Sequence, residues 1–139
     1  MEKITYHGWE DSIRVSNGRM ELVVTTVVGP RIVRCGFCGG TNLFASIPEE
    51  QGGRGEAAFR LRGGHRFWLA PEDMAVTYEP DNVPVTVTAI PGGVHLLQET
   101  GPLSGCRKEL FITMESDADR VRVEHRVTNQ GTSPRKLAP

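Results

Sequence analysis

The chain lacks any apolar stretch close to the roughly 20 residues that a membrane-spanning helix needs. It also lacks a basic excess, since 16 lysines and arginines face 17 aspartates and glutamates, for a net charge of −1. Proteins that bind nucleic acid through phosphate neutralisation carry such an excess. We therefore expect no membrane-spanning helix and no membrane or nucleic-acid partner.

Cysteine is scarce, with three residues in a chain of 139. Three thiols cannot all pair with one another, and disulfides persist mainly in oxidising compartments. Residues 1–15, MEKITYHGWEDSIRV, lack the apolar core of a secretory signal peptide. We expect reduced thiols and a cytoplasmic protein.

Good helix formers are few, because Val, Ile and Thr together are nearly twice as numerous as Leu and Ala. β-branched residues are favoured in strands and penalised in helices. The 16 glycines and 9 prolines cluster between short apolar segments, as expected for turns between strands. We predict an all-β protein in which residues 1–139 form one antiparallel β-sandwich domain, about the usual size of a domain.

The predicted strands follow one another at the short spacing of a sandwich. They are Ile4–Trp9, Ser12–Ser16, Met20–Val28, Arg31–Phe37, Asn42–Ile47, Phe59–Arg62, Val83–Ile90, Val94–Glu99, Cys106–Glu115 and Arg120–Thr128. The last of these alternates most cleanly, with Val121, Val123 and Val127 on one face. Residues 135–139 are predicted to begin a further strand.

The segment RLRGGHRFWLAPE, residues 60–72, has the highest density of chemically useful side chains. Arginine and histidine donate hydrogen bonds to hydroxyl or phosphate oxygens. Tryptophan offers a flat apolar face, and glycine lets the backbone approach a ligand closely. Such a set suits a sugar site, and the alternative is a surface loop anchored by a buried tryptophan. The residues expected to contact the sugar are Arg62, His65, Arg66, Trp68 and Glu72.

Other candidate groups have simpler explanations. Cys35 and Cys38 have the spacing of two zinc ligands. Within the chain only Cys106 and scattered histidines could complete the site, and the alternative is a zinc ion shared with the same pair of a second copy. We expect a hairpin turn there, no bound metal and no organic cofactor. His125 alternates with valines and is expected to be a satisfied residue of the sheet. Glu72 could serve as a general acid or base, but no partner for it is identifiable.

The order of four segments points to a known family. Asn17-Gly18-Arg19 leads into a long strand, followed by GPRIVRCGFCGGTNLFA (29–45), RGGHRFWLAPE (62–72) and finally VRVEHRVTNQGTSPRKLAP. In this order they resemble the first half of a galactose mutarotase-like (aldose 1-epimerase-like) protein. The resemblance implies a large antiparallel supersandwich with a carbohydrate site on a concave sheet. It also implies that Arg62 is the substrate-binding arginine of an Arg-Gly-Gly motif, with His65 and Arg66 lining the same pocket.

The resemblance covers only part of the enzymes of that superfamily. Their catalytic work is done by a histidine acid and a glutamate base, which exchange protons with the ring oxygen and the anomeric hydroxyl. Both belong to segments that would follow Pro139, and family members are about twice as long as this chain. The resemblance therefore implies a truncated fold without the acid–base pair.

Three functions remain open from the sequence. The first is a carbohydrate-binding domain or truncated epimerase homologue that contacts a sugar or sugar phosphate. The second is an aldose or hexose-phosphate epimerase completed by a second chain, and the third is a non-catalytic assembly protein that keeps only the scaffold. A half-fold would expose an apolar sheet face. Because a second copy is the simplest cover for that face, we expect a homodimer.

Overall fold

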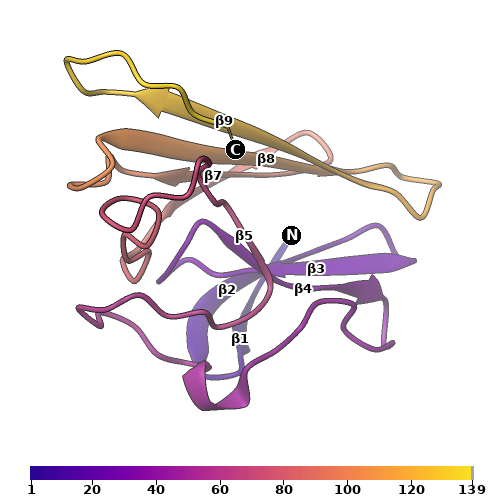
Figure 1. Ribbon diagram of the computed structural model, residues 1–139. Coiled ribbons are helices and arrows are strands. Elements are labelled where there is room, and N and C mark those ends of the chain that lie inside the picture. Colours follow the sequence, from indigo (N-terminus) through magenta and orange to yellow (C-terminus); the bar gives the residue numbers. More distant parts are fainter. Residues whose placement is uncertain (139) are drawn as a thin grey trace.

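Two antiparallel sheets face each other across one core (Figure 1). The structure, a computed structural model, describes residues 1–138. The first sheet has the strand order β1 (Glu2–Tyr6), β2 (Trp9–Ser16), β3 (Met20–Val24), β4 (Arg31–Phe37) and β5 (His65–Arg66). The second has the order β6 (Thr86–Ile90), β7 (Gly93–Gln98), β8 (Cys106–Met114) and β9 (Val121–Asn129). The prediction of an all-β antiparallel sandwich is confirmed.

Helical structure is limited to one short 3₁₀ turn, η1 (Pro48–Glu50), within residues 1–138. Across that same range, no helix has the length and apolarity needed to cross a bilayer. The rest of the segment 48–56 is irregular, as its glycine and proline residues indicate.

The core is built from the inward-facing residues of both sheets. Leu22 and Ile32 come from the first sheet, and Leu96, Leu110 and Ile112 come from the second; none is more than 1% exposed. Their alternation along the strands is the period-2 pattern that places one face of each sheet in the core. Burial of this apolar surface holds the two layers together.

The first sheet is also covered on its outer face. Trp9, Val23, Val28 and Val33 form a second buried cluster there, and the indole of Trp9 donates a hydrogen bond to the carbonyl of Gly53 at 2.9 Å. β3 is therefore buried on both of its faces, although it was predicted to extend over Met20–Val28. The strand nevertheless ends at Val24 rather than at residue 28.

Two predicted strands do not form. In residues 42–47, the Asn42 side chain bonds the backbone of Cys35, Phe44 and Val33, so it replaces strand pairing with a local turn. In residues 59–62, Arg62 has a φ of 56°, a left-handed conformation that ends an extended strand. An isolated bridge pairs Ser46 of the first segment with Gly63, which directly follows the second.

The apolar face of β9 is covered by the chain itself. Val121, Val123 and Val127 pack against the shared core, and Leu137 joins them. The predicted strand at 135–139 is reduced to one bridge, in which Ala138 pairs with Ala70, and residue 139 lies outside the described residues. The exposed face that led us to expect a homodimer is therefore absent from β9, because the first sheet supplies the facing layer.

Candidate functional site

The Arg62-Gly63-Gly64 turn sets the position of β5. Its three residues all have positive φ, at 56°, 81° and 75°. A Cβ on Gly63 would lie 2.4 Å from the carbonyl oxygen of Ala45, and one on Gly64 would lie 2.4 Å from that of Ile32. Only glycine fits both the conformation and this close approach of backbone to backbone. The turn delivers His65 and Arg66 to β4 at a fixed register.

Arg62 points into the protein rather than toward a ligand. Its side chain is fully buried, and its guanidinium donates to the carbonyl of Glu50 at 2.9 Å, to Asn82 Oδ1 at 2.9 Å and to the Glu56 carboxylate. An arginine with these contacts ties η1 and the following loop to the turn. This structural role differs from the substrate-binding role that the resemblance implies.

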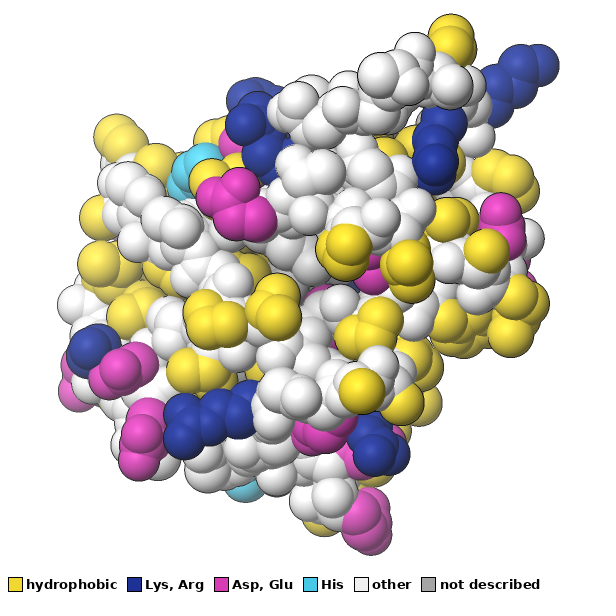
Figure 2. Space-filling view, turned by 90° about the vertical axis from the view of Figure 1, so that its left-hand side faces the viewer, with side chains coloured by type: hydrophobic (Ala, Val, Ile, Leu, Met, Phe, Trp, Pro, Cys, Tyr) yellow, Lys and Arg dark blue, Asp and Glu magenta, His cyan; other side chains and the backbone are white. Residues whose placement is uncertain are grey.

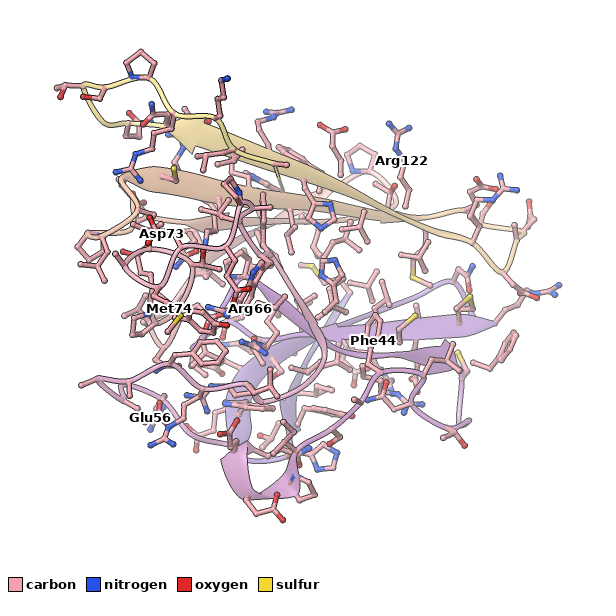
Figure 3. The ribbon with its side chains drawn as sticks, in the orientation of Figure 1. Phe44, Glu56, Arg66, Asp73, Met74 and Arg122 are labelled. Atoms are coloured by element: carbon pink, nitrogen blue, oxygen red, sulfur yellow. The ribbon has the colours of Figure 1, made fainter. Side chains whose placement is uncertain are left out.

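A buried ion cluster lies behind β5 and holds Arg66. The Asp81 carboxylate accepts from Arg31 Nη2 at 2.9 Å and from Arg66 Nε at 3.1 Å. Arg31 also donates to the carbonyls of Leu61 and Gly63, at 2.6 and 2.7 Å. Burial, opposed by the charge of Asp81, lowers the pKa of Arg66. These bonds fix the guanidinium of Arg66 between the two sheets (Figure 3).

A cluster of three partly exposed rings, Phe59, Trp68 and Tyr78, lies against Arg66, and we call it the aromatic site. The ring centroids are 5.2–5.9 Å apart, each pair edge to face. The Arg66 guanidinium lies 4.3 Å from the Phe59 centroid and 4.6 Å from that of Trp68. The Tyr78 hydroxyl donates to the exposed carboxylate of Glu72, and this bond raises the pKa of Tyr78. The site therefore combines flat apolar faces with a polar rim.

The surrounding loops expose further apolar side chains. Leu61, Met74 and Val83 are more than half exposed. Figure 3 shows Met74 and Asp73 on the left-hand side of the molecule. Figure 2, the view onto that side, shows hydrophobic side chains interspersed with both acidic and basic ones. The aromatic site thus belongs to a loop-rich side of the sandwich, where binding residues are commonly found.

The structure separates the five residues predicted for the site. Arg66, Trp68 and Glu72 meet at the aromatic site, whereas Arg62 is enclosed elsewhere and His65 points between the sheets. The Nε2 atom of His65 lies 3.0 Å from Nε2 of His125. Burial is the main cause that lowers the pKa of His65. The neighbouring His125 lowers it further, and Arg31 contributes less.

Sequence reasoning missed several partners of these residues: Arg31, Phe59, Tyr78, Asp81 and His125. Residues 80–82 carry the signal of an exposed turn, yet Asp81 and Asn82 are buried. The sequence did carry a signal for Tyr78 and Asp81. The segment Tyr78-Glu79-Pro80-Asp81-Asn82 concentrates acidic and amide side chains next to an aromatic ring, as a polar site requires. For Phe59 the sequence carries no such signal.

The Cys35–Cys38 segment forms the end of β4 and the following turn. Cys38 is exposed, and its sulfur lies 3.3 Å from the Ser16 hydroxyl. Burial raises the pKa of Cys35, which favours the thiol over the thiolate that binds metals. Among residues 1–138, no three His, Cys, Asp or Glu side chains are grouped so that they could hold a metal ion.

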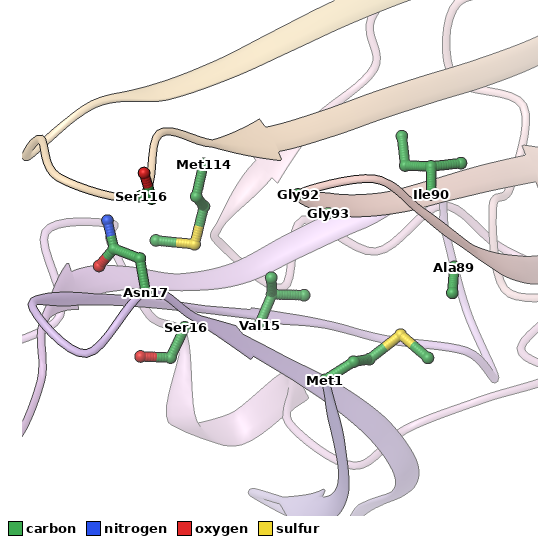
Figure 4. Close-up of a pocket in the computed structure, with 10 residues that line it drawn as sticks. All are labelled: Met1, Val15, Ser16, Asn17, Ala89, Ile90, Gly92, Gly93, Met114 and Ser116. Atoms are coloured by element: carbon green, nitrogen blue, oxygen red, sulfur yellow. The ribbon is translucent and has the colours of Figure 1, made fainter.

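Several hollows lie away from the aromatic site. One, of about 400 Å³, opens between the sheets near the end of β8 (Figure 4). Its lining comprises Met1, Val15, Ser16, Asn17, Ala89, Ile90, Gly92, Gly93, Met114 and Ser116. Another, of about 220 Å³, is lined by Glu49, Glu50, Gln51, Gly53, Glu56 and Arg60. Asn17 already bonds four backbone groups, so the larger hollow offers a ligand mainly apolar surface.

No family model, no curated protein and no solved structure matches this chain. The resemblance to the galactose mutarotase-like superfamily therefore stays a prediction made from the residues. What the chain binds has to be inferred from the chemistry of the site itself.

Proposed function

We propose that this chain is a carbohydrate-binding domain and that its ligand is a neutral sugar that lies on the aromatic site. The observation that carries the proposal is the gathering of Phe59, Trp68 and Tyr78 at the surface with the Glu72 carboxylate beside them. The family resemblance, which implies a sugar ligand, supports the same proposal independently.

The chemistry of the two partners matches. A sugar ring has a face of C–H groups that packs on an aromatic ring, and a rim of hydroxyl groups that need polar partners. Aromatic side chains supply a large, rigid apolar area, and an ionised carboxylate accepts hydrogen bonds from hydroxyls. Pockets that combine apolar walls with few polar groups are typical of small-molecule sites.

The local charges favour a neutral sugar over a sugar phosphate. Arg66 is the cation nearest to the rings, and it is already bonded to Asp81 and to the carbonyl of Glu79. Glu72 is exposed and its carboxylate accepts from Tyr78 at the rim of the rings. A phosphate on the rings would meet the Glu72 carboxylate at close range, and like charges at short distance repel.

We expect calorimetric titration with D-galactose or D-glucose to give a dissociation constant in the millimolar to high-micromolar range, about −4 to −5 kcal/mol. Glucose 6-phosphate should bind more weakly than glucose. Trp68→Ala should weaken the binding at least tenfold, because it removes the largest flat face of the site. A suitable control is Phe37→Ala, because Phe37 is 55% exposed at the far end of β4.

Tryptophan fluorescence gives a second readout. Trp9 is 1% exposed, so a change in emission on adding sugar reports on Trp68. The proposal fails if Trp68→Ala and wild type give equal heats with every sugar, or if Phe37→Ala loses binding to the same extent as Trp68→Ala.

The epimerase alternative makes a different prediction for the same preparation. We expect no acceleration of the mutarotation of freshly dissolved glucose or galactose, followed by polarimetry. His65 and His125 could exchange protons, but their Nε2 atoms face each other at 3.0 Å and Nδ1 of His65 is buried. General acid–base groups typically contribute about 10²–10⁴-fold when they reach the substrate. A protein-dependent rate that disappears in His65→Gln would support the enzyme instead.

A further inference from the structure

His65 and His125, the histidine pair, join the two sheets at one edge of the sandwich. His65 lies on β5 and His125 on β9, and their Nε2 atoms are 3.0 Å apart. The ring centroids are 4.9 Å apart, and Phe67 packs edge-on against His125 at 5.0 Å. Because neither strand pairs with the other, the histidine pair is a polar link across a largely apolar interface.

The hydrogen bonds of the two rings indicate which nitrogen of each histidine carries the proton. Nδ1 of His65 is buried and has no hydrogen-bond partner among residues 1–138. Nδ1 lacks a partner in either tautomer, but a buried N–H without an acceptor is rarer and less favourable than a buried acceptor without a donor. The proton of His65 therefore belongs on Nε2, where it is donated to Nε2 of His125. His125 then carries its own proton on Nδ1.

A second proton has no favourable position in this arrangement. On His65 it would occupy the buried Nδ1 without an acceptor. On His125 it would occupy Nε2 and face the N–H of His65, so two donors would point at each other at 3.0 Å. Either way, protonation breaks the link or leaves a buried charge unsolvated.

The groups around the histidine pair do not offset an added positive charge. β4 contributes Arg31 and β5 contributes Arg66, and both are charged and bonded to Asp81. β8 contributes the buried Lys108, which pairs with Val127 two residues from His125. On β9 itself, the neighbours Glu124 and Arg126 are exposed, as expected for residues on the opposite face of the strand.

We propose that the histidine pair is a proton-operated latch, closed when both rings are neutral and opened by protonation, which frees β9 and the segment after it from β5. β5 forms only two register pairs with β4. The segment after β9 is held to the segment after β5 by the Ala70–Ala138 bridge. Opening would therefore need the loss of few backbone hydrogen bonds. It would expose the buried Phe67 and the half-buried face of β9.

The direction of the pH effect follows from the position of His65. Burial, the neighbouring His125 and Arg31 lower the pKa of His65 below its ordinary value. The unfolded or opened chain then binds a proton more readily than the closed one. The closed state loses stability as pH falls below the ordinary histidine pKa of about 6.5 and keeps it above that value.

Hydrogen exchange of wild-type backbone amides at pH 7.5 and pH 5.0, corrected for the intrinsic exchange rate, tests the latch. For one linked proton, the opening should increase up to tenfold per pH unit between the ordinary histidine pKa of about 6.5 and the lowered pKa of His65 in the closed state. The amides of Ala70 and Ala138 report this opening, because each bonds the carbonyl of the other. The double variant His65→Gln/His125→Gln retains a donor and an acceptor at each position but cannot titrate, so its Ala70 and Ala138 amides should show no such increase. His95→Gln is the matched control, because His95 bonds Glu109 from β7 and should leave the wild-type response intact.

An equal increase in the double variant, or no increase in wild type, would overturn the proposal. If the double variant does not fold, the ¹⁵N chemical shifts of the imidazole nitrogens in wild type decide the matter. The proposal requires that, at pH 7.5, His65 is protonated on Nε2 and His125 on Nδ1. Protonation of His65 on Nδ1 would rule it out.

Discussion

Asp81→Asn is expected to destabilise the fold by about 3–5 kcal/mol, the usual cost of removing one partner from a buried ion pair. Asp81 is 2% exposed, and its carboxylate accepts from both Arg31 and Arg66. The substitution keeps the shape of the side chain and removes only its charge. Two guanidinium groups would then remain buried without this anion, and the amide would bring further donors toward them.

Urea unfolding at neutral pH, followed by circular dichroism, measures this loss. The control is Asp119→Asn. Asp119 lies on the exposed turn between β8 and β9, and its carboxylate accepts from Arg19 at 2.7 Å. Solvent screens that pair, so the control should change stability little. Similar midpoints for the two variants would mean that the buried cluster does not hold β5 as we describe.

Gly64→Ala is expected to cause the second large loss of stability. Gly64 has a φ of 75°, and an L-residue in this region costs about 1–2 kcal/mol. The added Cβ would lie 2.4 Å from the carbonyl oxygen of Ile32, and relieving such overpacking costs about 1–3 kcal/mol more. Because β4 and β5 pair at this point, the clash should also displace Arg66 and weaken sugar binding at the aromatic site.

Gly39→Ala separates the cost of the left-handed backbone conformation from the cost of the steric clash. Gly39 has nearly the same φ, 71°, but a Cβ there meets nothing within 4 Å. Its variant should show only the backbone cost of about 1–2 kcal/mol and should bind sugar as wild type does. Thermal unfolding of both variants gives the comparison, and equal losses at Gly39 and Gly64 would contradict the close approach of β5 to β4.

Arg62 and Trp68 illustrate how far the candidate site could be predicted from the sequence. Both lie in one segment of unusual composition, and that density identified the region that contains the aromatic site. Composition gave no indication that the Arg62 guanidinium turns inward to Glu56 and Asn82 while Trp68 stays at the surface. Two left-handed glycines after Arg62 reverse the direction of the chain, and the outcome depends on contacts with segments up to 20 residues away.

The sequence by itself determined the class of this protein and most of its strands. β4 spans Arg31–Phe37 as predicted, and β8 and β9 differ from the predicted ranges by a residue at their ends. Strand alternation and turn residues are local properties, and so the chain carries them without reference to its fold. The same local rules failed at 42–47 and 59–62, where side chains take over the backbone hydrogen bonds.

Only the tertiary structure decided which polar residues are buried and which meet. Asp81 is 50 residues from Arg31 in the chain, and His125 is 60 residues from His65. No local pattern encodes such a pairing, because the energy of a buried charge or a shared proton depends on the partner that the fold brings to it. The ion cluster, the histidine pair and the aromatic site are therefore products of the way the two sheets and their loops pack.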